Sequence, residues 1–141
     1  MLERYTVPVG PLACNCTILA DSATGEAVVV DPGAQIELIV HRLMQRGWKL
    51  TAILITHAHI DHIGGAAELK SRTGAPVWFN PRDRALAAML AEQAMWIGVP
   101  PPPAVALDSE LTREAKLMLG AHRLQVLETP GHTEGSVCLY L

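Results

Sequence analysis

The feature that most constrains this chain is a short apolar run that ends abruptly in a cluster of polar side chains. Residues Ala52–Ile55 are all apolar, which predicts a strand buried on both faces of a sheet. Just after this run come three histidines and one aspartate within six positions: His57, His59, Asp61 and His62. The residues past the carboxyl end of a strand are where open α/β sheets place their sites. We therefore expect the functional site in this stretch.

The mixture of imidazole and carboxylate groups indicates a divalent metal, with zinc first and iron or manganese as alternatives. His57 and His59 are two positions apart, so both can point to one side of an extended backbone. Asp61 and His62 are offset from them and should point elsewhere, which suits two adjacent metals better than one. The alternative is a polar loop whose histidines only cap a helix, but four ligand-type residues so close together are rarely of that kind.

The stretch Thr56–His62 resembles the His-x-His-x-Asp-His signature of the metallo-β-lactamase fold superfamily. Gly64, Gly65 and the later Thr129–Thr133 look most like its glyoxalase II-like hydrolases, the hydroxyacylglutathione hydrolases. The resemblance spans nearly the whole chain. It implies an α+β fold, the αβ/βα sandwich of two similar halves. Residues 1–141 would then form one domain that covers mainly the first half.

The same resemblance implies roles for two further residues. His132 sits on a loop just past a predicted strand, and it becomes the third ligand beside His57 and His59. Three histidines leave the open position that a catalytic metal needs. Asp31 matches an acidic position near the metal ligands; its local pattern predicts a turn, and we expect a turn role that also supports the ligands.

The sequence departs from the family in its length. Superfamily members normally continue with more strands and helices, which supply an aspartate that bridges two metals and a last histidine. Neither position is found here, so we expect a truncated chain whose second metal site, with only Asp61 and His62, is poor. We also expect an uncovered apolar sheet face and a free strand edge at 136–141, and hence self-association.

Composition narrows the partners and the compartment. The chain has 141 residues, half of them apolar, which is enough for one domain with a sizeable core. The net charge of −3, without a basic block, argues against nucleic acid and anionic membranes, and no apolar run is long enough to span a bilayer. The three cysteines and the absence of an apolar signal core near Glu3 and Arg4 predict a cytoplasmic protein.

Local patterns predict most of the elements. Strands are expected over 4–20 (a pair), 27–30, 49–56, 76–79 and 123–128, with another beginning at Ser136 and Cys138 pointing inward. Helices are expected from Ile36 to a C-cap at Gly47, over 63–72, and from Asn80 to Gly98. The prolines at 100–103 must be extended, and 100–119 has no clear pattern.

The resemblance implies a metal-dependent hydrolase in which metal-bound water becomes the nucleophile, and Asp61 orients the hydroxide and takes the proton that the water releases. The resemblance implies a small-molecule thioester substrate such as S-lactoylglutathione. Two alternatives remain. One is a mononuclear iron dioxygenase acting on a glutathione persulfide, which shares these motifs and needs few ligands for a second metal. The other is a truncated, inactive metal-binding domain.

Overall fold

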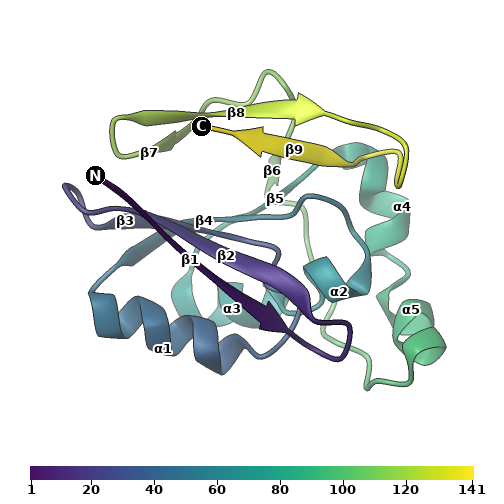
Figure 1. Cartoon of the computed structure of the whole chain (residues 1–141). Coiled ribbons are helices and arrows are strands. Elements are labelled where there is room, and N and C mark those ends of the chain that lie inside the picture. Colours follow the sequence, from purple (N-terminus) through teal and green to yellow (C-terminus); the bar gives the residue numbers. More distant parts are fainter.

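The computed structural model describes all residues, 1–141, and contains two β-sheets that face each other, with helices on the far side of one of them (Figure 1). The strands are β1 (Leu2–Val9), β2 (Cys14–Asp21), β3 (Glu26–Val30), β4 (Lys49–Leu54), β5 (Val77–Phe79), β6 (Ser109–Glu110), β7 (Leu117–Leu119), β8 (His122–Glu128) and β9 (Val137–Tyr140). The helices are α1 (Ile36–Arg46), α2 (Ile60–Ile63), α3 (Ala66–Thr73), the 3₁₀ helix η1 (Pro81–Asp83), α4 (Arg84–Ala87) and α5 (Leu90–Ile97). The predicted α+β class is confirmed.

The larger sheet has six strands in the order β1-β2-β3-β4-β5-β6, and the smaller has three in the order β7-β8-β9. The first two pairings of the larger sheet are antiparallel, and those from β3 to β6 are parallel. Strand β4 lies inside this sheet, with Ile53 opposite Val29 on one side and Val77 on the other. The loop after β4 therefore leaves from the middle of the sheet.

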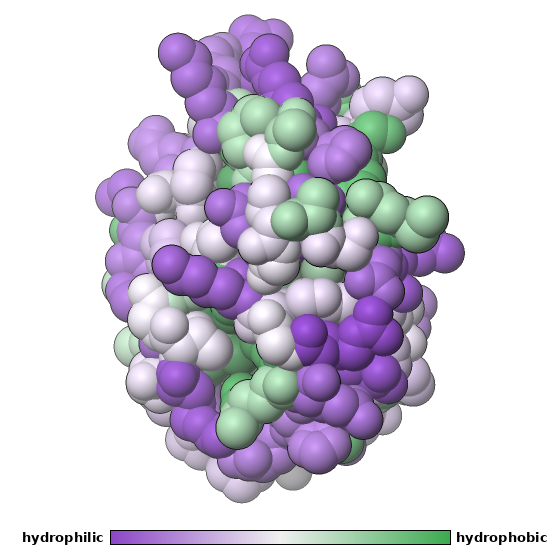
Figure 2. Space-filling view, turned by 90° about the vertical axis from the view of Figure 1, so that its left-hand side faces the viewer, coloured by the Kyte–Doolittle hydropathy of each residue, from purple (hydrophilic) through white to green (hydrophobic).

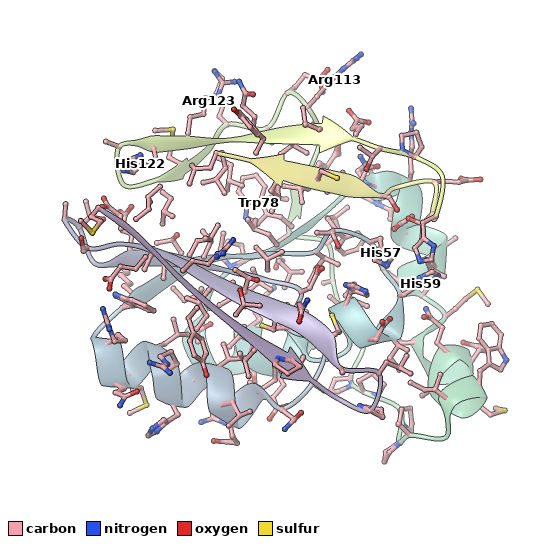
Figure 3. All side chains as sticks on the ribbon, viewed as in Figure 1. His57, His59, Trp78, Arg113, His122 and Arg123 are labelled. Atoms are coloured by element: carbon pink, nitrogen blue, oxygen red, sulfur yellow. The ribbon has the colours of Figure 1, made fainter.

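Strand β4 is buried on both faces, as its sequence predicts, because each face belongs to a different core. Ile53 and Ile55 pack with the helices α1 and α3 in one core. Ala52 and Leu54 pack with the inner face of the small sheet in the other core, which includes Leu124. Figure 3 shows Trp78 in this second layer, between the two sheets. Alternating side chains thus fix the strand between two layers.

Helix α1 has the predicted limits and C-cap, but Met44, the last residue of the predicted apolar stripe, is exposed. Its buried residues recur at helical spacing and face the core: Ile36, Ile39, Val40 and Leu43. Gly47 ends the helix in the left-handed conformation, with φ of 66°, and its backbone N–H reaches the carbonyls of Leu43 and Met44. The end of β3 is held next to the end of β4 by the backbone N–H of Asp31, which donates to the carbonyl of Leu54.

Two predicted helices are interrupted. The helix expected over 63–72 is two helices, α2 and α3, which meet at Gly64 and Gly65. The backbone N–H of Gly65 donates to the carbonyl of Pro32, which binds this junction to the loop after β3. The helix expected from Asn80 to Gly98 begins with the predicted Asn80 cap but forms η1, α4 and α5 in succession.

One prediction about side-chain direction is wrong. Cys138 does not point inward; it is exposed, and its neighbour Val137 is buried instead. Cys138 is opposite Leu127 in the pairing of β8 with β9, and Leu127 is also exposed. Since side chains alternate along a strand, a shift of one position reverses the direction of every residue.

The surface that Figure 2 shows, on the left-hand side of Figure 1, is mostly hydrophilic, with hydrophobic residues scattered among the polar ones. None of the helices combines the length and the apolar character that crossing a bilayer requires. The predicted extended stretch at 100–103 has neither helix nor strand, and the rest of the poorly patterned segment contributes only the short strands β6 and β7.

Candidate metal centre

Three histidines from two loops meet beside the carboxyl end of β4. His57 and His59 follow β4, and His132 lies on the loop that joins β8 to β9. Each offers one ring nitrogen, and these three atoms all lie within 4.8 Å of one another. The ring centroids of His59 and His132 are 4.7 Å apart, and those of His57 and His132 are 4.9 Å apart. Figure 3 shows His57 and His59 beneath this β8–β9 connection. The structure thus brings together the three residues that the sequence analysis grouped.

The donor set fits a divalent transition metal. Three imidazoles with one open position are typical of catalytic zinc sites, and imidazole also suits iron. Two of the three rings are half-buried and His132 is exposed, so a ligand can reach the group from solvent.

The surroundings of His57 and His59 favour the neutral form of these two imidazoles. Burial, together with the nearby His62, lowers the pKa of His57 to about 4. Burial and the neighbouring His132 also lower the pKa of His59. A neutral imidazole has a free lone pair, and a protonated one does not. Both rings are therefore in the ligating form at neutral pH.

Asp61 and His62, the other two predicted ligands, lie beside the triad but are not part of its three-way cluster. The ring centroids of His62 and His57 are 4.0 Å apart. The Nε2 atom of His62 lies 3.3 Å from the Asp61 carboxylate, while its Nδ1 atom lies 2.8 Å from the Asp31 carboxylate. His62 is thus held between two carboxylates.

The pairing with Asp31 determines the charge of His62. Burial favours the neutral ring, but the hydrogen bonds to Asp31 and Cys14 outweigh it and raise the pKa of His62 to about 10. The Sγ atom of Cys14 is 3.4 Å from Nδ1. His62 therefore carries a proton at neutral pH, and it must release that proton before it can bind a metal through Nε2.

Asp31 is the residue that fixes the end of β4. Its carboxylate accepts a hydrogen bond from the backbone N–H of Thr56 at 2.8 Å and another from the Thr56 hydroxyl at 2.7 Å. The same hydroxyl lies 3.1 Å from Nδ1 of His57. Asp31 itself has a positive φ of 55°, and its carbonyl accepts a hydrogen bond from the backbone N–H of Gly33, which turns the chain here. The two roles expected of Asp31 thus occur together in the structure.

Two buried polar residues that the sequence analysis did not single out also touch the loop. Asp83 and Gln93 are 2% and 4% exposed, and both bind the backbone around Ala58. Gln93 accepts a hydrogen bond from the N–H of Ile60 and donates to the carbonyl of Ala58. In the sequence, Asp83 has the pattern of an ordinary residue at a helix start. Gln93 falls in an apolar helical stripe. A polar residue on a face that should be buried is the only sequence signal for its role.

A cavity of about 300 Å³ reaches Asp61, although none of the four histidines of this region lines it. Asp61 is in its wall, together with the tip of the β1–β2 hairpin, the start of α3 and the proline stretch after α5. Apolar side chains contribute much of the lining, including Val9, Ile60 and Ile97. The cavity therefore has room for an organic ligand within reach of Asp61.

Comparison with known proteins agrees with this geometry. The sequence model of the Metallo-beta-lactamase superfamily matches residues 9–141. The hydroxyacylglutathione hydrolase GloC of Haemophilus influenzae is 32% identical over 133 residues, which are 93% of this chain and 62% of that protein. The chain thus spans less than two thirds of the length of this relative.

Two solved structures share the fold. The BLEG-1 B3 metallo-beta-lactamase is 33% identical with a TM-score of 0.86, over 98% of this chain and 66% of that one. TTHA1623, in a di-iron-bound form, is 32% identical with a TM-score of 0.82, over 96% of this chain and 66% of that one. The fold, the histidine cluster and the family match agree: this chain belongs to the metallo-beta-lactamase superfamily.

Proposed function

We propose that the chain carries the metal centre of a metal-dependent hydrolase whose substrate is a thioester such as S-lactoylglutathione. The observation that carries the proposal is the meeting of His57, His59 and His132 from two distant loops. The similarity to a hydroxyacylglutathione hydrolase supports the thioester. Because the chain covers 62% of that relative, the substrate is tested separately from the metal site.

The residues have separate tasks in this proposal. His57, His59 and His132 would hold the metal, with Asp61 and His62 beside them for a second ion. A bound divalent cation lowers the pKa of water towards neutrality and polarises a carbonyl group. Asp61 would orient the attacking water and accept its proton, because its carboxylate lies 3.3 Å from Nε2 of His62 and Asp61 is also part of the cavity wall. The cavity would receive the organic part of the thioester.

We propose zinc as the metal, with iron or manganese as alternatives. A set of three histidines accepts zinc or iron, and the relative of known structure with two iron ions supports iron as a natural alternative. We also propose a cytoplasmic location. Its support is the three free cysteines, Cys14, Cys16 and Cys138.

A second candidate is an iron dioxygenase acting on a persulfide. The observation that favours it is the cluster of His57, His59 and His132, which can hold a single metal without ligands from Asp61 or His62. A hydrolase needs no oxygen, whereas the dioxygenase consumes it. Oxygen uptake with glutathione persulfide, after anaerobic purification with iron, distinguishes the two.

The experiment that tests the leading proposal measures metal content and hydrolysis on the same samples. The chain is reconstituted with zinc, and then metal per chain and loss of the thioester absorbance of S-lactoylglutathione are measured. We expect about one metal per chain or more, and hydrolysis that disappears in His59→Ala. The matched control is His41→Ala, which changes an exposed histidine on α1. Metal binding without any hydrolysis would overturn the proposed thioesterase activity and favour a binding role.

A further inference from the structure

The three histidines lie on two loops that are far apart in the sequence: His57 and His59 on one, His132 on the other. Contacts from the rest of the fold must therefore fix the position of one loop relative to the other. Asp83, at the end of η1, touches both loops. Its Oδ2 atom accepts a hydrogen bond from the backbone N–H of Ala58, the residue between His57 and His59, at 3.0 Å. The same atom accepts another from the hydroxyl of Thr133, the residue after His132, at 2.9 Å.

The second oxygen of the carboxylate completes the link. Its Oδ1 atom accepts a hydrogen bond from the backbone N–H of Gly135 at 2.8 Å. A Cβ atom at position 135 would lie 2.7 Å from Cγ of Asp83, so the absence of a side chain allows this approach. Thr133 is itself fixed by Ser136, whose hydroxyl lies 2.8 Å from the Thr133 hydroxyl. One buried carboxylate therefore satisfies three donors, two of them from the His132 loop.

We propose that Asp83 is the positioning residue of the metal centre: it sets the distance between the His57–His59 pair and His132. The inference rests on the proposed metal site. Asp83 does not touch the metal position. It acts through the backbone of Ala58 and the Thr133–Gly135 turn, as residues behind metal ligands commonly do. A buried carboxylate costs free energy to desolvate, and three donors to it offset that cost.

An asparagine at this position tests the link with little change in volume. Asparagine has one acceptor oxygen, and its NH₂ group must face a donor that the carboxylate satisfied. We expect Asp83→Asn to weaken Zn²⁺ binding by about 10-fold to 100-fold, measured by competition with a chromophoric chelator. The visible spectrum of the Co²⁺-loaded chain should also change, because it reports the geometry of the three imidazoles.

The matched control is Asp108→Asn. Asp108 also accepts a backbone hydrogen bond, from Val77, and pairs with Lys70, but none of its partners lies in either ligand loop. This variant should lose stability without a change in metal affinity or in the Co²⁺ spectrum. If Asp83→Asn loses stability to the same degree and keeps both the affinity and the spectrum, Asp83 is only structural and the inference is overturned.

If Asp83→Asn does not fold, two variants at Thr133 test the same link. Thr133→Val removes one of the three donors while preserving the shape of the side chain, and Thr133→Ser restores the hydroxyl. We expect roughly a 10-fold loss of affinity in Thr133→Val and recovery in Thr133→Ser. Equal affinity in both variants would overturn the inference.

A readout without metal separates this inference from the proposed function. In the metal-free chain, the amide protons of Ala58 and Gly135 should exchange slowly with solvent, and both should lose protection together in a folded Asp83 or Thr133 variant. If the wild-type chain binds no metal, the proposed function fails, and joint loss of protection would still support the link. Independent behaviour of the two amides would overturn it.

Discussion

His132 is the one member of the triad that comes from the second loop, so its contribution to metal binding can be removed without touching β4. We expect His132→Ala to lower Zn²⁺ affinity by more than about 100-fold, because two histidines remain where three were available. Chelator competition measures the loss. His41→Ala, on the exposed side of α1, should leave the affinity unchanged. An unchanged affinity in His132→Ala would exclude this residue as a ligand.

The charge of His62 gives a prediction about pH. Its pKa is about 10 in the folded chain and near 6.5 when unfolded, so the folded state binds the proton more tightly. The stability contributed by this proton is therefore complete below pH 6.5 and is lost as the pH rises through about 10.

An NMR titration of the metal-free chain should show His62 protonated at pH 8. In Asp31→Asn, the midpoint should fall towards 6.5, since the partner charge is gone. A wild-type midpoint near 6.5 would contradict the pairing.

The sequence signal for a metal-ligand role is strong for some of the histidines and weak for others. His57, His59, Asp61 and His62 stand out because four ligand-type residues crowd into one short stretch. His132 is a single histidine on a loop, and only its resemblance to a family motif indicated a role. Asp83 gave no signal at all, because its partners, two backbone N–H groups and one hydroxyl, come from loops that only the tertiary fold brings together.

At the scale of elements, helix α2 depends on a close approach to the loop after β3. A Cβ atom on Gly33 would lie 1.7 Å from the carbonyl oxygen of Asp61, so any side chain there must push the helix away. We expect Gly33→Ala to lower the free energy of unfolding by about 3 kcal/mol or more, measured by urea denaturation of the metal-free chain.

The control for that variant is Gly74→Ala, at the end of α3. Position 74 has open space but a φ of +77°, so alanine there should cost only about 1–2 kcal/mol through backbone strain. If Gly33→Ala were no more destabilising than Gly74→Ala, the contact between α2 and the β3 loop would be looser than the structure indicates.

Elements with a strong local pattern were predicted well, and those shaped by contacts were not. The apolar stripe of α1 and its Gly47 cap lie within one short segment, and the structure has both. The break between α2 and α3 is different, because Gly65 turns to donate to the distant Pro32. The predicted direction of the Cys138 side chain was wrong for the same reason, because the pairing of β9 with β8 decides which face of the sheet Cys138 occupies.

At the scale of the whole molecule, the inner face of the small sheet is buried and its outer face is open. The inner face contributes Leu117, Leu119, Leu124, Val126 and Val137 to the second core. On the outer face, four large or sulfur-containing side chains are exposed: Met118, Leu127, Cys138 and Tyr140. Strand β9 is also an edge of the sheet. Apolar surface next to an unpaired edge favours association.

We therefore propose that the chain self-associates through the outer face of β7–β9. Sedimentation at micromolar concentration should show a species larger than the monomer. The double variant Leu127→Lys/Tyr140→Lys should shift it towards the monomer, because two charges would be buried without partners in the contact. Met44→Lys is the control, since Met44 is equally apolar and 77% exposed but lies on α1, away from this sheet.

A wild-type chain that sediments as a single monomeric species would contradict the proposal. Equal dissociation by the Met44 variant would place the contact elsewhere, because the outer face of the sheet would then have no special part in it.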